Sequence, residues 1–146
     1  LAGCVATPYY GGTGYYRGLK GEEIPFLSRI IAVADVFDAL TSVRHYRNRM
    51  PVEKVAEILE SGKGNHFDGR CVDTFNRMPS DRVLMVMESE RDRKASEDLS
   101  IFKHVSWQRL VELVSGSKPK RGEDGVRESF DRLYNFGLPE GYKALD

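Results

Sequence analysis

The stretch from Phe26 to Ser42 is the feature that most constrains the fold. Its apolar residues recur at three- and four-residue spacing, namely Leu27, Ile30, Ile31, Ala34, Phe37 and Leu40. This period gathers them on one face of an α-helix. Glu22 and Glu23 precede the stretch, and acidic residues are favourable at the positive end of a helix. Pro25 suits a first helical turn. We therefore expect an amphipathic and well-buried helix.

Most of the remaining chain also has a helical pattern. Further helices are expected over 51–61, 70–78, 106–114 and 126–136. Proline begins the first of them and Gly62 ends it, as the preferences of helix termini predict. The sequence "DRVLMVME", residues 81–88, fits a strand or a helix, because a short apolar run does not decide between them. The prediction is an all-α fold, with one short strand as an open alternative.

Composition excludes several classes of protein. The chain has 146 residues, enough for one domain, and its 22 Lys and Arg residues balance 22 Asp and Glu residues. Zero net charge is not typical of a protein that binds a nucleic acid polymer. No apolar run approaches the roughly 20 residues of a membrane helix. Cys4 and Cys71 lie far apart and form no metal or redox motif, so we expect a reducing, cytoplasmic compartment.

The glycine-rich segment Gly11–Pro25, "GGTGYYRGLKGEEIP", raises the question of phosphate binding. Its glycines are one residue off the dinucleotide fingerprint, and no strand precedes them, so a Rossmann site is rejected. The Ser or Thr and the spacing of a P-loop are also missing. Judged alone, the segment is more typical of a turn.

Two aspartates interrupt the apolar helix. Asp35 and Asp38 are three residues apart, so they share one face. Because Asp35 lies within an apolar run, we expect it to be buried, which is costly unless it is paired or bound to metal. One interpretation is an ion pair with arginine or a helix cap. The other is a metal ligand.

A basic segment follows, in which Arg44 and Arg47 flank Tyr46. It fits either a solvated turn or a phosphate clamp, since arginines grip phosphate oxygens in pairs. His66 and Asp68 lie close together in "GNHFDG". In such a turn they are more often residues that form local hydrogen bonds than metal ligands.

Taken in order, "GTGYYRGLKGEEIPFLSRIIAVADVFDALTSVRHYR" and "GNHFDGRCVDTF" resemble the second half of an HD-GYP domain. HD-GYP domains are bacterial metal-dependent phosphodiesterases that open cyclic di-GMP. The resemblance runs from about Gly11 to Met78, roughly half of the chain. It implies a helical HD-domain-like bundle, here partial. It divides the chain into an HD-GYP-like part, residues 1–78, and a helical extension, residues 79–146.

The resemblance also implies roles for individual residues. Asp35 matches a ligand of the family's Fe, Mn or Mg cluster, and Asp38 matches a second acid that supports the site. Arg44 matches an arginine that holds the substrate phosphate. Arg47 stands where the family often has lysine, so the positive charge is kept and Arg47 is also expected to contact the phosphate.

The family's G-Y lip corresponds to Gly14 and Tyr15, which with Tyr46 are expected to contact substrate or a partner.

The front of the lip departs from the family's signature, which reads H-H-E-x-x-D-G-x-G-Y-P. Ala6 and Thr7 stand at the two histidine ligands, and Gly11 stands at the aspartate. The H-D pair that lies upstream in the family is absent from this sequence. Removing several ligands abolishes metal binding. We therefore expect the chain alone to hold no metal and to be inactive as a hydrolase.

The alternative to a fragment of a phosphodiesterase is a degenerate module kept for binding. Its ligand would be cyclic di-GMP or a protein, such as a diguanylate cyclase domain or a second copy of the chain. A partial domain would also leave one face of the helix at 26–42 without its usual partners. Either the C-terminal helices near Trp107 and Phe130 cover that face, or a second chain does.

Overall fold

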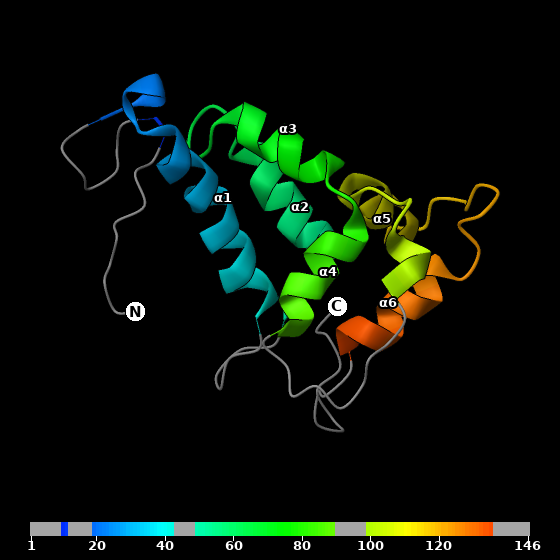
Figure 1. Cartoon of the computed structure of the whole chain (residues 1–146). Helices are drawn as coiled ribbons and strands as arrows, with labels where there is room; N and C mark the ends of the chain where they lie inside the picture. The colour runs from blue at the N-terminus through cyan, green and yellow to red at the C-terminus, as the bar shows by residue number, and fades with distance from the viewer. Residues whose placement is uncertain (1–9, 12–18, 43–48, 90–98, 136–146) are drawn as a thin grey trace.

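The computed structural model describes residues 10–11, 19–42, 49–89 and 99–135 as a helical bundle (Figure 1). Its α-helices are α1 (Phe26–Thr41), α2 (Val52–Ser61), α3 (Gly69–Arg77), α4 (Ser80–Ser89), α5 (Trp107–Val114) and α6 (Val126–Asn135). Two short 3-10 helices are η1 (Gly21–Glu23) and η2 (Leu99–Phe102). The all-α prediction is confirmed. The segment left open between strand and helix is helix α4, and no strand occurs within these described ranges.

Helix α1 begins at Phe26, directly after Pro25 at its N-cap, and it packs against α2 and α3. The face that meets these helices is buried through Ala32, Val33, Phe37 and Thr41. The prediction of a well-buried helix is wrong for the opposite side. Four of its large apolar side chains are exposed, namely Phe26, Leu27, Ile30 and Ile31. The reason is that α2 and α3 cover only one side of α1.

The core joins the N-terminal and C-terminal helices through Trp107, whose side chain is 0% exposed. Its ring meets Phe37 of α1 edge-on, with centroids 5.1 Å apart, and Phe75 of α3 at 5.8 Å. Phe130 of α6 is buried in the same cluster. Trp107 of α5 therefore joins α2 and α3 in covering the inner face of α1, whereas the outer face of α1 stays exposed.

The chain crosses from α3 to α4 without leaving this core. Ser80 begins α4 and donates from both its backbone N and its Oγ to the Val105 carbonyl, each at 2.8 Å. The backbone N–H of Trp107 donates to the Met78 carbonyl, also at 2.8 Å. The division predicted between residues 78 and 79 stays a prediction, and the core runs across it.

The loop between α5 and α6 is anchored to α5. Arg109 donates to Glu123 through Nε at 3.0 Å and through Nη2 at 2.7 Å, and it also donates to the Lys118 carbonyl. Glu123 in turn accepts from the Lys120 N–H. These bonds lower the pKa of Glu123 to about 2, with Arg109 as the main cause.

No helix in the described ranges is both long enough and apolar enough to cross a membrane.

Candidate functional site

A groove with a volume of about 1150 Å³ lies between α1, α3 and α4. Its apolar lining includes Val33, Phe37, Phe75 and Val83. Its polar and charged lining comes from Asp35 and Asp38 of α1, Arg70 and Thr74 of α3, Arg82 of α4, and Thr41, Ser42 and Arg49 at the end of α1 and beyond it. The groove thus places two carboxylates on its α1 wall and arginines on the walls that face it.

Asp35 is exposed, which corrects the expectation that it is buried. The helix face that carries it lines the groove, whereas α2 and α3 cover the other face. Its carboxylate therefore stays solvated, and no desolvation cost has to be compensated. It forms no ion pair with any residue of the described ranges. Asp38 is also exposed, and its Oδ1 accepts from the Ser42 hydroxyl at 3.0 Å.

The donors near Asp35 do not fit a metal centre. Across the described parts of the chain, no three side chains of His, Cys, Asp or Glu come together in a way that could hold an ion. Two neighbouring carboxylates fall short of the ligand set that a catalytic site needs. His66 and His104 are exposed on other parts of the bundle and do not line the groove.

Five of the predicted site residues, namely Gly14, Tyr15, Arg44, Tyr46 and Arg47, lie outside the described residues. Arg49, the third arginine of the basic segment, is described and lines the groove. Its Nη1 donates to the Tyr134 carbonyl at 3.0 Å, and its guanidinium lies 5.1 Å from the centre of the Tyr134 ring. Arg49 therefore ties the groove's edge to α6.

Asp68 is the feature that the sequence interpretation underestimated. Its side chain is 2% exposed, and it caps α3 by accepting from the Arg70 N–H at 2.9 Å. This local bond confirms its role in the turn. Asp68 also accepts from Arg29 Nη1 of α1 at 2.7 Å and from Arg70 Nη2 at 3.0 Å. The hydrogen bonds from Arg70, and then from Arg29, lower the pKa of Asp68 to about 2, although burial acts to raise it.

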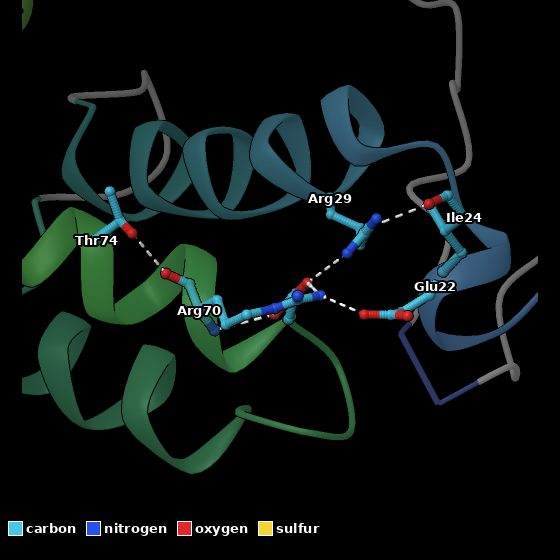
Figure 2. A network of polar contacts seen from close by, with 6 residues as sticks. Glu22, Ile24, Arg29, Arg70 and Thr74 are labelled. Atoms are coloured by element: carbon cyan, nitrogen blue, oxygen red, sulfur yellow. Dashed lines mark hydrogen bonds and ion pairs between the residues drawn. The ribbon is translucent and has the colours of Figure 1, made fainter.

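Through Arg29 and Arg70, the contacts of Asp68 extend to η1, and Figure 2 shows these two arginines beside Ile24 and Glu22. Arg29 Nε donates to the Ile24 carbonyl at 3.0 Å, and Ile24 is itself 1% exposed. Arg70 Nη2 pairs with Glu22 Oε1 at 2.9 Å. We call Glu22, Ile24, Arg29, Asp68 and Arg70 the Asp68 network. It joins η1, α1 and the start of α3, three elements that are separated in the sequence by as much as 48 residues.

The sequence held a signal for this network. Asp68 directly precedes a helix, as an N-cap does, and Arg29 is the one basic residue of α1, on a helix that is otherwise mostly apolar. A charged side chain placed in that way needs a partner. The sequence did not indicate that Arg29 and Asp68 lie close together in the fold.

The base of the glycine-rich segment rests on the turn that carries Asp68. The Gly21 N–H donates to the Tyr10 carbonyl at 2.7 Å, so Gly21 is held to the residue that directly precedes the segment. The N–H groups of Tyr10 and Gly11 donate to the carbonyls of His66 and Asn65, at 3.3 and 2.5 Å. A Cβ at Gly11 would lie 2.7 Å from Asn65 Oδ1 and 2.9 Å from its carbonyl O. This structure has no room for an aspartate there.

Comparison with known proteins finds a family model and relatives that match this part of the chain. The family model described as "HD domain" matches residues 8–71, which include the base of the glycine-rich segment, α1, α2 and the turn at Asp68. Over 68 residues the chain is 48% identical to a cyclic di-GMP phosphodiesterase response regulator, RpfG, of Xanthomonas campestris; the alignment covers 47% of this chain and 18% of that protein. Residues 8–71 belong to an HD domain of the HD-GYP type.

Other relatives extend the similarity. A cyclic di-GMP phosphodiesterase of Thermotoga maritima is 37% identical over 118 residues, which is 81% of this chain and 28% of that protein. An alignment of that length runs past residue 78 into the predicted extension. A 3'3'-cGAMP-specific phosphodiesterase of Vibrio cholerae is 47% identical over 84 residues, which is 55% of this chain and 18% of that protein. No solved structure matches.

The chain spans only a small part of these proteins. The aligned residues make up between 11% and 28% of the length of the curated relatives that it matches.

Proposed function

We propose that this HD-GYP-type chain binds a cyclic dinucleotide in bacterial signalling, and that on its own it does not hydrolyse it. The observation that carries the proposal is a groove of about 1150 Å³ that is lined by three arginines, Arg49, Arg70 and Arg82. The residues that flank the segment with Arg44 and Arg47, which are Ser42 and Arg49, both line the same groove.

The names of the relatives support the class of ligand. Relatives with similar identity to this chain are named for cyclic di-GMP in some cases and for 3'3'-cGAMP in others. Identity alone therefore favours a cyclic dinucleotide without choosing between the two. Cyclic di-GMP is the ligand that we propose, and 3'3'-cGAMP is the comparison that tests the choice.

The proposal that the chain does not hydrolyse its ligand rests on the residues present. HD-domain phosphodiesterases depend on metal, which would activate water and neutralise the phosphate. The described residues at Asp35 do not fit a metal centre, and Ala6 and Thr7 replace two histidine ligands. Without a cation, the carboxylates of Asp35 and Asp38 repel a phosphodiester, and binding depends on the arginines.

Calorimetry with cyclic di-GMP tests this proposal directly. Arg44→Ala removes a charge-assisted hydrogen bond, worth about 1.5–3 kcal/mol, so the affinity should fall roughly tenfold or more. Arg121→Ala, at an exposed arginine in the loop after α5, is the matched control and should leave the affinity unchanged. Equal heats for wild type and Arg44→Ala, or no heat with either nucleotide, would remove the nucleotide-binding function.

The variant Asp35→Asn distinguishes a metal-free binding site from a metal site. In the presence of EDTA, removing a repulsive charge should tighten cyclic di-GMP binding about two- to threefold, as expected for partly screened charges. The same titration with Mn²⁺ should give the same result. If Asp35→Asn instead weakens binding in Mn²⁺, Asp35 is a metal ligand, and the metal-independent proposal is wrong.

The exposed outer face of α1 favours a second candidate function, which is protein binding. Leu27 is 67% exposed and Ile31 43% exposed, and Phe26 and Ile30, which also line the groove, extend the patch. Patches of this kind mark association surfaces. The partner would be a diguanylate cyclase domain or a second copy of the chain.

Sedimentation velocity tests the protein-binding candidate. Self-association should appear as a sedimentation coefficient that rises with concentration and that Ile31→Glu abolishes. Lys54→Glu, at an exposed position on α2, should not change it. A monomer at all concentrations that also fails to retain a cyclase domain in a pull-down would refute this candidate.

A further inference from the structure

We infer that Arg29 and Asp68 are positioning residues, which hold the base of the glycine-rich segment against the N-terminal ends of α1 and α3. This inference deepens the proposed function, on which its consequence for ligand binding rests. The structural part of the inference does not depend on that function. It rests on the burial, the hydrogen bonds and the location of the Asp68 network.

Asp68 is the one buried charged residue in the described ranges, where the other buried polar residues are Thr41 and Ser80. A buried ion pair adds little net stability compared with apolar packing, yet removing one partner is costly. A cap alone does not require burial, because Asn or Ser would cap α3 equally well at the surface. The second partner, Arg29, is therefore the informative feature. Its bond to Asp68 forms only when α1 and α3 have the correct relative position.

Arg29 makes contacts in two directions from one planar group. Nη1 donates to Asp68 on α3, and Nε donates to the Ile24 carbonyl at the end of η1. A guanidinium supplies several donors in a fixed fork, whereas a lysine ammonium lacks this fork geometry. Arg29 is six residues before Asp35 on α1, or about 9 Å along the helix axis. Because both residues lie on α1, holding Arg29 in place also sets where Asp35 lies around and along the helix axis.

The other end of the glycine-rich segment rests on the same turn. Tyr10 and Gly11 donate to the backbone of His66 and Asn65, next to Asp68, and Gly21 donates to Tyr10. Tyr10 and Gly11 are therefore held directly by the turn, and Gly21 is held to it through Tyr10. Holding a binding segment in place before the ligand arrives lowers the entropy lost on binding and so raises affinity. The turn "GNHFDG" is thus the platform for the segment.

Amide hydrogen exchange tests the structural part. Asp68→Asn keeps the cap but removes the charge that Arg29 and Arg70 share, and Arg29→Lys keeps the positive charge but loses the fork. In both variants we expect exchange at the Gly21 and Ile24 amides to accelerate about tenfold, with no comparable change at Leu110 in α5.

The matched control is Asp73→Asn, an exposed carboxylate on the same helix that pairs with Lys63. It should leave the exchange at Gly21 and Ile24 unchanged. An equal acceleration at Leu110 would mean that Asp68 only stabilises the fold as a whole, and no acceleration at Gly21 would mean that the segment is held by other contacts. Either result overturns the inference. If Asp68→Asn fails to fold, Arg29→Lys still tests it.

Cyclic di-GMP titrations of the same variants test the functional part. We expect Arg29→Lys to lower the affinity about three- to tenfold and Asp73→Asn to leave it unchanged. If the exchange accelerates but the affinity of Arg29→Lys equals that of wild type, the network does not serve ligand binding. If wild type binds neither cyclic di-GMP nor 3'3'-cGAMP, the proposed function fails, and the exchange data alone decide the positioning role.

Discussion

Replacing Asp68 with asparagine removes one negative charge from the buried centre of the Asp68 network and keeps the side chain's shape and its cap on α3. The size of the effect follows from the pKa of the carboxyl. Arg70 and Arg29 lower it from an ordinary 3.8 to about 2 in the folded chain. A pKa difference of this size corresponds to about 2 kcal/mol of stability. Wild type should therefore exceed Asp68→Asn by about 2 kcal/mol at pH 7 for this reason alone.

The sign of the pH dependence follows from the direction of the shift. Because the folded pKa is depressed, the carboxylate contributes its stability in full above the unfolded pKa of about 3.8. That contribution is lost as the pH falls toward the folded pKa of about 2. The difference in unfolding free energy between wild type and Asp68→Asn should thus be flat above about pH 5 and should shrink by about 2 kcal/mol between pH 5 and pH 2.

Urea unfolding followed by tryptophan fluorescence measures this difference. Trp107 is the single tryptophan of the chain, and it is fully buried where α1, α3 and α5 meet, so it reports on the core. Asp73→Asn is the control, and it should differ from wild type by no more than about 1 kcal/mol at any pH, as a surface pair does. A difference for Asp68→Asn that is independent of pH would refute the reasoning, because it would show that the charge is not what stabilises the fold.

Three further predictions concern other contacts. Gly11→Asp restores the acid of the family signature but places a Cβ 2.9 Å from the Asn65 carbonyl oxygen. We expect this variant to be destabilised by about 1–3 kcal/mol in the same urea assay. If its stability equals that of wild type, the backbone at Gly11 can move. Gly62→Ala brings a Cβ to 2.6 Å from the Phe67 ring. We expect thermal unfolding to show a loss of at least about 1 kcal/mol of stability. An unchanged stability would contradict the tight packing at Gly62. Glu123→Gln weakens the bond to Arg109 that anchors the loop after α5. Trypsin should then cut that loop faster than in wild type, and equal cleavage rates would show that other contacts hold it.

Most helices of this bundle could be predicted from sequence because their signals are local. Apolar residues at helical spacing, a proline at the start and a glycine at the end predicted α2 within one residue at its start, and the same logic found α1. Helix α4 could not be assigned because its apolar run is short, and the decision came from packing, where Val83 and Leu84 are buried. The helix η2 had no recognisable pattern.

The candidate site also combines features that are set locally with features that are set by packing. The sequence by itself determined that Asp35 and Asp38 share one helix face, because the helical period is a property of the backbone. Only the tertiary structure decided that this face is exposed to a groove, since exposure depends on which helices pack against it. The same holds for Asp68: its cap on α3 is local, whereas its bond to Arg29 joins residues 39 positions apart. Such a pairing is set by the packing of α1 on α3, and no spacing within either segment encodes it.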